Sequence, residues 1–358
     1  LYRFGGYPVY TNTLTTYFPS GEAKFDILLR ELEKAERFIF LEYFIIQEGK
    51  MWNTILNILE RKVKQGVDVR VVYDDIGCLL TLPYRYCDQL EKKGIRCKVF
   101  NEFKPIWSAK MNNRDHRKIL VIDGHTAFNG GINLADEYIN AYEKHGHWKD
   151  TAVMLKGEAV WSFTMMFLTM WNYLNNSKPA SYDYYMPRTK DIAPYKSGGY
   201  VIPYTDSPLD DEPVGENAYL NIINDAKDYV YITTPYLIID NEMVTALTLA
   251  AKSGVDVRII TPHIADKWFV HAVTRAYYKK LTKLGVKIYE YTPGFIHAKN
   301  FVSDDSVAVV GTINLDFRSL YLHFECATWM YKTDCVLDVK ADYLKTLEEC
   351  QEITYEDC

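Results

Sequence analysis

Residues 116–133 read HRKILVIDGHTAFNGGIN, and residues 297–314 read HAKNFVSDDSVAVVGTIN. Both stretches fit the pattern His-x-Lys-x4-Asp-x6-Gly-x-x-Asn with identical spacing. Five fixed residue types at this spacing would match by chance on the order of once in ten thousand chains of this length. Two matches in one chain therefore indicate that a single structural unit has been duplicated.

Three further pairs of segments repeat in the same order along the chain, which supports the duplication. They are residues 35–41 (AERFIFL) with 226–232 (AKDYVYI), 66–72 (GVDVRVV) with 254–260 (GVDVRII), and 94–99 (GIRCKV) with 285–289 (GVKIY). Between the two copies, Asn, Ser, Lys, Pro and Gly cluster in a way that is typical of a linker. We expect an N-terminal domain at residues 1–175, a linker at 176–199 and a C-terminal domain at 200–358.

Each copy alternates between segments with helical spacing of apolar residues and short apolar runs. Residues 22–36 and 53–65 have helical spacing, and the runs at 38–46 and 67–73 that follow them are typical of buried strands. This alternation predicts an α/β fold made of two similar α/β/α lobes with mixed, largely parallel sheets. We expect the lobes to pack face to face around one shared active site.

Composition excludes several classes of protein. The 358 residues are 48% hydrophobic and 25% charged, which rules out low-complexity disorder, collagen and a small disulfide scaffold. The net charge of −6 argues against a protein that coats nucleic acid, so no nucleic-acid partner is expected. Seven scattered cysteines without a Cys-x-x-Cys pair predict a reduced chain without a zinc site. The longest apolar stretch, residues 161–173, is too short to span a membrane.

The repeated His and Lys residues can converge on one pocket. Residues two apart on a strand point to the same face of a sheet, so His116 and Lys118 share a face, as do His297 and Lys299. If the two lobes face each other, two imidazoles and two ammonium groups meet. A phosphate group is the occupant that such a pocket favours, because the lysines neutralise its charge.

The remaining groups of the pattern fit the same occupant. The side-chain amides of Asn133 and Asn314 can donate hydrogen bonds to phosphate oxygens. One neutral histidine can attack phosphorus while the other, protonated, gives its proton to the leaving alkoxide. This chemistry needs no metal and no cofactor, and the chain has no carboxylate cluster that would hold a metal.

Two carboxylates follow the motifs at similar distances. Asp150 lies 34 residues after His116, and Glu325 lies 28 residues after His297. A histidine that passes through a phosphorylated state is helped by a carboxylate on its other ring nitrogen. A plain surface ion pair is the alternative for both residues. The histidines without such partners are expected to be structural or surface residues: His125, His145, His147, His263, His271 and His323.

These motifs resemble the phospholipase D superfamily, whose duplicated HKD motif is His-x-Lys-x4-Asp-x6-Gly-Ser-x-Asn, and within it the bacterial cardiolipin synthases. The similarity runs over nearly the whole chain, and GTINLDFRS at residues 311–319 is its most specific block. The resemblance implies a duplicated phospholipase D-like fold. It also implies phosphatidyl transfer between two phosphatidylglycerol molecules, which gives cardiolipin and glycerol through a phosphatidyl-histidine. A phospholipase D, or another phosphatidyltransferase or phosphodiesterase of this superfamily, is the alternative.

The resemblance also implies a role for each site residue. His116 is expected to be the nucleophile and His297 the acid and then the base. If the lobes meet across a pseudo-twofold axis, Glu325 orients His116 and Asp150 orients His297. The HKD aspartates are expected to fix the lysines and the local backbone. The expected catalytic set is His116, Lys118, Asp123, His297, Lys299 and Asp304, and the expected phosphate ligands are Asn133, Asn314 and Thr312.

The chain departs from the family pattern at a few positions. Gly131 and Thr312 replace the motif Ser, and His323 stands where the subfamily usually has Asn. Family members usually carry transmembrane helices before the catalytic part. We therefore expect an anchor upstream of this chain, the cytoplasmic face of the cell membrane as its location, and phosphatidylglycerol and other membrane phospholipids as partners. Residues 78–84 and 268–280 are candidates for a membrane-facing lip, with ordinary helix packing as the alternative.

Overall fold

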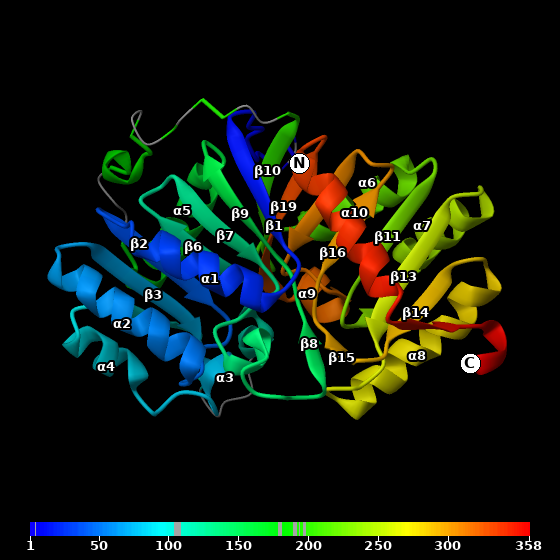
Figure 1. The fold of residues 1–358 in the computed structure, drawn as a ribbon, viewed down its shortest axis with the longest axis horizontal. Helices are drawn as coiled ribbons and strands as arrows, with labels where there is room; N and C mark the ends of the chain where they lie inside the picture. Colours follow the sequence, from blue (N-terminus) through cyan, green and yellow to red (C-terminus); the bar gives the residue numbers. More distant parts are fainter. Residues whose placement is uncertain (4, 104–108, 178–180, 189–191, 193, 196–197) are drawn as a thin grey trace.

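A computed structural model describes residues 1–3, 5–103, 109–177, 181–188, 192, 194–195 and 198–358. Two lobes of related structure lie side by side, with the N-terminal lobe in blue to green and the C-terminal lobe in yellow-green to red (Figure 1). The predicted linker at 176–199 lies partly outside the described residues. Its described part includes a short 3-10 helix, η3 (Asp183–Tyr185).

The first lobe contains a mixed sheet with the strand order β1-β9-β7-β6-β2-β3-β4. Its strands are β1 (Thr13–Phe18), β2 (Phe38–Tyr43), β3 (Asp68–Asp74), β4 (Arg96–Phe100), β6 (Lys118–Ile122), β7 (Thr126–Gly130) and β9 (Ala152–Gly157). Its helices are α1 (Gly21–Leu32), α2 (Lys50–Lys64), α3 (Asp75–Cys78), α4 (Tyr86–Lys92) and α5 (Val160–Asn175).

The second lobe repeats this arrangement with the strand order β10-β19-β17-β16-β11-β13-β14-β20. Its strands are β10 (Tyr200–Asp206), β11 (Tyr229–Thr233), β13 (Asp256–Pro262), β14 (Lys287–Tyr291), β16 (Asn300–Ser303), β17 (Val307–Gly311), β19 (His323–Tyr331) and β20 (Cys350–Ile353). Its helices are α6 (Val214–Asp225), α7 (Asn241–Lys252), α8 (Trp268–Lys283), α9 (Phe317–Tyr321) and α10 (Asp334–Leu347). The duplicated α/β architecture is therefore confirmed.

Most neighbouring strands in these two orders are antiparallel, so the prediction of largely parallel sheets is wrong. Parallel pairing within them is confined to β2-β3-β4 and β11-β13-β14, whose strands are joined by helices. The strands that carry Lys118 and follow Lys299, β6 and β16, turn back directly into β7 and β17. A tight turn can join only antiparallel strands, and the turns after β6 and β16 were not predicted.

The HKD aspartates make these tight turns. Asp123 and Gly124 have φ angles of 53° and 74°, and Asp304 and Asp305 both have φ angles of 50°. Two successive residues with left-handed backbone are what a type I′ hairpin turn requires, and Asp and Gly tolerate that conformation. The aspartate of each motif thus ends the motif strand and reverses the chain.

The apolar core lies in layers on both faces of each sheet. One cluster fills the space between the first sheet and α1, α2 and α4, and another lies between the second sheet and α6, α7 and α8. A further cluster spans both lobes and contains the buried faces of α5 and α10. Helix α5 also contacts β10 of the second lobe, and α10 contacts β1 of the first. This shared core holds the lobes in a fixed relation, as a site built between them requires.

The stretch at residues 161–173 belongs to α5, most of which is buried in that shared core. Among the described residues, no helix combines the length and the apolar character needed to cross a membrane.

Candidate active site

Two short strand pairs cross between the lobes and bring the two motifs together. In one, β5 (Arg114–Asp115) pairs with the start of β19, and in the other β15 (Gly294–Ile296) pairs with β8 (His147–Lys149). The backbone N–H of His116 then donates to Phe324 O, and that of His297 donates to Lys149 O. Each motif histidine is therefore held beside a residue that precedes a carboxylate of the opposite lobe.

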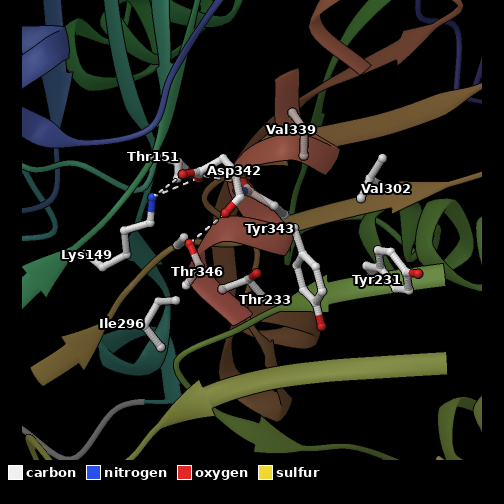
Figure 2. Close-up of a pocket in the computed structure, with 12 residues that line it drawn as sticks. Lys149, Thr151, Tyr231, Thr233, Ile296, Val302, Val339, Asp342, Tyr343 and Thr346 are labelled. Carbon is white, nitrogen blue, oxygen red and sulfur yellow. Dashed lines mark hydrogen bonds and ion pairs between the residues drawn. The ribbon is translucent and has the colours of Figure 1, made fainter. Parts of the chain in front are cut away.

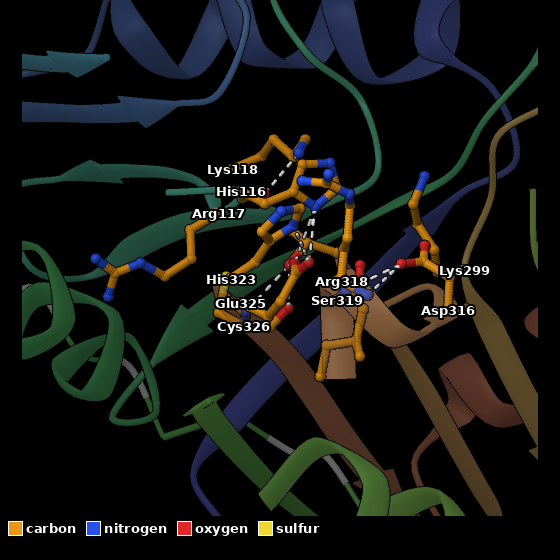
Figure 3. Close-up of polar contacts among 12 residues, drawn as sticks. His116, Arg117, Lys118, Lys299, Asp316, Arg318, Ser319, His323, Glu325 and Cys326 are labelled. Atoms are coloured by element: carbon orange, nitrogen blue, oxygen red, sulfur yellow. Dashed lines mark hydrogen bonds and ion pairs between the residues drawn. The ribbon is translucent and has the colours of Figure 1, made fainter. Parts of the chain in front are cut away.

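Each motif histidine contacts that carboxylate. His116 Nδ1 lies 2.9 and 3.0 Å from the two carboxylate oxygens of Glu325 (Figure 3). His297 Nδ1 lies 2.7 Å from Asp150 Oδ2. These are the pairs that the pseudo-twofold arrangement predicted, and both carboxylates are fully buried. An Nδ1–H that donates to a carboxylate leaves Nε2 with a free lone pair, which is the form of imidazole that can attack an electrophile.

Burial favours the neutral form of both imidazoles. It lowers the pKa of His116 to about 3, with Glu325 opposing the shift and Lys118 adding to it. It also lowers the pKa of His297 well below the usual value, and the ammonium groups of Lys299 and Lys118 lower it further. Lys118 belongs to the N-terminal lobe and His297 to the C-terminal lobe, so charges of one half-site change the pKa of groups in the other.

The two motif lysines fold back onto the carbonyl groups of their own histidines. Lys118 Nζ donates to His116 O at 2.6 Å, and Lys299 Nζ donates to His297 O and lies 2.8 Å from His297 Nδ1. Burial lowers the pKa of Lys118 to about 8 and that of Lys299 to about 7, although Glu325 and Asp150 attract both cations. An incoming anion would restore their positive charge, so the site favours a negatively charged ligand.

Thr312 and Gly131 occupy equivalent places beside the two carboxylates. The Thr312 hydroxyl donates to Glu325 and accepts the N–H of Cys326 at 3.0 Å. A Cβ atom on Gly131 would lie 2.2 Å from Asp150 Oδ1. Thr312 was predicted to bind phosphate, but its hydroxyl is committed to Glu325 instead. Gly131 makes room for Asp150, which explains why this motif lacks a hydroxyl residue.

The two predicted phosphate-binding asparagines differ in their contacts. Asn133 Oδ1 accepts the N–H of Ile45 at 3.0 Å, and its Nδ2 donates to the Tyr138 hydroxyl at 2.7 Å. Asn314 is also buried, but its Oδ1 has no hydrogen-bond partner among the described residues. The side-chain amide of Asn133 therefore stabilises the protein through two hydrogen bonds. The side-chain oxygen of Asn314 makes no such bond to the described residues.

The HKD aspartates do not fix the lysines, contrary to one part of the prediction. Asp123 accepts the backbone N–H groups of Glu36, Arg37 and Phe38, each at 2.8 Å. Asp304 accepts three equivalent N–H groups, those of residues 227–229, at 2.7 to 3.0 Å. Five residues of strand place each aspartate about 16 Å from its lysine. Both residues tie the turn to the start of β2 or β11 and have a structural role.

Sequence reasoning missed Lys24, a buried lysine on α1. It is 1% exposed, and its Nζ donates to Ile132 O at 3.4 Å. Burial lowers its pKa to about 7, against the attraction of Asp150. In the second lobe the Tyr219 hydroxyl donates to the equivalent carbonyl, Ile313 O, at 2.9 Å. The signal in the sequence was the helical spacing that places Lys24 on the apolar face of its helix.

His323 was also expected to be structural, yet it lies in the site. Its ring centroid is 5.6 Å from that of His116, and its Nδ1 is 3.7 Å from Glu325 Oε1. Both ring nitrogens are buried without a hydrogen-bond partner among the described residues. Its position two residues before Glu325 on a strand was the available signal, because such residues share a face.

A small cavity lies behind the second motif, on the opposite side of its strand from His297 and Lys299. It is lined by Ile296, Ala298 and Asn300 and closed by the Lys149–Asp342 ion pair at 2.7 Å (Figure 2). Its volume of about 10 Å³ is close to the least that admits one water molecule. This cavity cannot hold a substrate.

Comparisons with known proteins agree with the duplication. A family model described as "Cardiolipin synthase, PLD-like domain" matches residues 28–171 and 219–347. A Streptococcus mutans protein named "Uncharacterized protein" is 58% identical over 354 residues, which are 99% of this chain and 76% of that one. A cardiolipin synthase of Geobacillus kaustophilus is 36% identical over 356 residues, 99% of this chain and 70% of its own. The crystal structure of phosphatidylserine synthase from Haemophilus influenzae has the same fold, with a TM-score of 0.73, 16% identity and coverage of 96% of this chain and 88% of that one.

Proposed function

The chain belongs to the phospholipase D-like family, and from this we propose that it is a phosphatidyltransferase that makes cardiolipin from phosphatidylglycerol. The observation that carries the proposal is the pair of buried histidines, each joined through Nδ1 to a carboxylate of the opposite lobe. Both Nε2 atoms are left for a reaction at phosphorus, and the buried lysines favour an anion between them.

In the first step, Nε2 of His116 attacks the phosphorus of phosphatidylglycerol. The bond from phosphorus to the glycerol headgroup oxygen breaks, and His297 gives a proton from Nε2 to that oxygen. The proton reaches His297 when the anionic lipid binds, because a nearby phosphate opposes the low pKa that burial imposes on this imidazole. Glycerol leaves, and the phosphatidyl group stays on His116.

In the second step, the headgroup hydroxyl of another phosphatidylglycerol gives its proton to His297 and attacks the same phosphorus. The bond between phosphorus and His116 breaks, which releases cardiolipin and restores the free imidazole. Glu325 holds the Nδ1–H of His116 throughout, so Nε2 always faces the substrate.

Charge balance supports a phosphodiester as the ligand. In the first step the site holds four cations, which are the protonated Lys24, Lys118, Lys299 and His297, and three buried carboxylates, which are Asp150, Glu325 and Asp316. The one negative charge of a phosphodiester makes up the difference. This matters because an unbalanced charge in a buried site is costly.

Two exposed apolar segments near the site support substrate capture from a membrane. After α3, Leu80 is 96% exposed, and at the start of α8, Trp268 is 80% exposed. The first segment is near His116, because helix α3 packs on the backbone of Phe44, whose ring lies 5.0 Å from that of His116. The second segment is near His297, because Lys267, which precedes Trp268, is close enough to His297 to lower the pKa of that histidine. Both segments thus flank the histidines, and their exposure contradicts ordinary packing for these two side chains. Exposed leucine and tryptophan side chains of this kind insert at lipid interfaces.

Two substrates test the proposal and separate the roles of the histidines. With phosphatidylglycerol in mixed micelles and chelator present, we expect cardiolipin and free glycerol in equal amounts by mass spectrometry. With phosphatidyl-p-nitrophenol, the leaving group needs no proton, so the His297→Asn variant should still release nitrophenol. The same variant should lose about 100 to 10,000-fold with phosphatidylglycerol.

The His116→Asn variant should be inactive with both substrates. His263→Asn is the matched control, since its imidazole pairs with Glu290 outside the site. Phosphatidic acid in place of cardiolipin would assign the chain to the phospholipases instead. Full activity of the His116→Asn variant with either substrate would refute the proposed mechanism.

A further inference from the structure

His116, His323 and Glu325 form a three-residue cluster whose third member the proposed reaction does not use. Each of these side chains offers one ligand atom, and the three atoms all lie within 4.8 Å of one another. Elsewhere among the described residues, no comparable set of His, Cys, Asp or Glu side chains comes together. The cluster is unusual because both ring nitrogens of His323 are buried and neither has a hydrogen-bond partner within the part of the chain that the structure describes.

The spacing of the cluster fits a tetrahedral metal ion. The Nδ1 atoms of His116 and His323 lie 2.9 and 3.7 Å from the same oxygen, Glu325 Oε1. Ligands held about 2.0 Å from a tetrahedral zinc ion lie about 3.3 Å from one another. Small movements of two side chains would therefore give three ligands at the required separation. The other oxygen of Glu325 is held by the Thr312 hydroxyl, which fixes the carboxylate in place.

We propose that His116, His323 and Glu325 form an inhibitory site for a divalent transition-metal ion, of which zinc is the best fit. Two imidazoles and one carboxylate suit zinc, whereas magnesium and calcium prefer oxygen ligands alone. The sequence predicted no zinc site because Cys-x-x-Cys pairs are absent, but the site proposed here uses no cysteine.

Metal binding and the proposed reaction exclude each other, so the inhibition rests on the proposed function while the binding does not. A neutral imidazole has one N–H. If Nδ1 of His116 binds the metal, the proton must move to Nε2, which then has no lone pair for phosphorus. The ion also replaces the hydrogen bond between His116 and Glu325 that selects the reactive tautomer.

The binding test uses zinc and cobalt ions with the full chain, purified without a histidine tag and freed of metal. Titration with zinc in competition with a zinc-sensitive dye should show that each wild-type chain binds one zinc ion tightly. His323→Asn should weaken that binding at least about 100-fold, because even the loss of an outer partner of a ligand weakens binding 10 to 100-fold. His263→Asn is the matched control and should bind as the wild type does, because its histidine–glutamate pair lacks a third ligand.

The cobalt spectrum checks the ligands without any substitution. Cobalt in the wild type should give the visible bands of a four-coordinate ion and no thiolate charge-transfer band in the near ultraviolet. A thiolate band, wild-type binding by His323→Asn, or no binding at all would each overturn the site. In the transferase assay, zinc should inhibit and chelator should restore activity. If the chain has no transferase activity even with chelator present, the proposed function is rejected. The metal site is then judged by the binding measurements alone.

Discussion

Replacing Lys24 by Met should stabilise the fold in a manner that depends on pH. Met has a similar length and no charge, so it fills the same buried space on α1 without the cost of a desolvated ammonium group. The pKa of Lys24 falls from its usual 10.5 to about 7 in the folded chain. Between these two pH values the unfolded chain binds more protons at this residue than the folded chain does. Wild-type stability therefore rises with pH across this window, and below about pH 7 the full penalty remains.

The size of the effect follows from that shift. A pKa shift of this size corresponds to about 5 kcal/mol of destabilisation at pH 6 and about 2 kcal/mol at pH 9. Met also loses the hydrogen bond to Ile132 O, which costs about 1 kcal/mol at every pH. Lys24→Met should thus be more stable than the wild type by about 3 to 4 kcal/mol at pH 6, and the gain should shrink by roughly 3 kcal/mol by pH 9.

Urea unfolding at pH 6 and pH 9, followed by tryptophan fluorescence, measures the difference. Groups that titrate equally in both proteins cancel in the comparison. Lys64→Met is the matched control, because Lys64 is exposed at the end of α2 and should show little change in stability at either pH. If Lys24→Met increases stability by the same amount at both pH values, or decreases it at pH 6, the interpretation of Lys24 as a buried cation with a desolvation cost is refuted. Transferase activity should fall in Lys24→Met, because the site loses one of its cations.

Two further substitutions probe the site and its surroundings. Gly131→Ala should push the Asp150 carboxylate away from its histidine and reduce turnover at least about tenfold, whereas Gly198→Ala, whose nearest neighbour would lie at 3.5 Å, should leave turnover unchanged. Leu80→Glu should reduce co-flotation with phosphatidylglycerol vesicles without changing turnover of a short-chain, micelle-free substrate. Leu337→Glu, an equally apolar exposed position on α10, is its control, and equal flotation of both variants would count against the membrane-facing lip.

The sequence was sufficient to predict the duplication, because a five-residue pattern at fixed spacing is rare enough to carry the inference by itself. It also predicted which carboxylate meets which histidine, since a pseudo-twofold axis leaves only one cross-lobe pairing. It did not predict that the motif strands form hairpins. Asp123 and Asp304 were interpreted through their expected role beside the lysines, and their ability to adopt left-handed backbone was overlooked.

The contacts of single side chains were harder to predict, because they depend on neighbours that are distant in sequence. The hydroxyl of Thr312 could serve a phosphate or a carboxylate, and only the position of Glu325 decides between them. Lys24 belongs to no motif, and a lysine on an apolar helix face usually reaches solvent by extending its side chain. In this chain the side chain of Lys24 is 1% exposed, so its ammonium group cannot reach solvent and remains buried in the site.

The two half-sites are not equivalent, and the differences favour different roles for the two histidines. Among the described residues, Glu325 has no hydrogen bond or ion pair with a lysine, although its charge attracts Lys118. It is held by Thr312, and its negative charge supports the positive charge that the His116 imidazole gains on bonding to phosphorus. Asp150 is surrounded by Lys299, Lys118 and Lys24, and the Lys299 ammonium lies 2.8 Å from the nitrogen that Asp150 contacts. An imidazole crowded by a cation gives up a proton readily, which suits the acid that protonates glycerol. The identical motifs could not distinguish these roles, and from the groups behind them we propose His116 as the nucleophile and His297 as the acid.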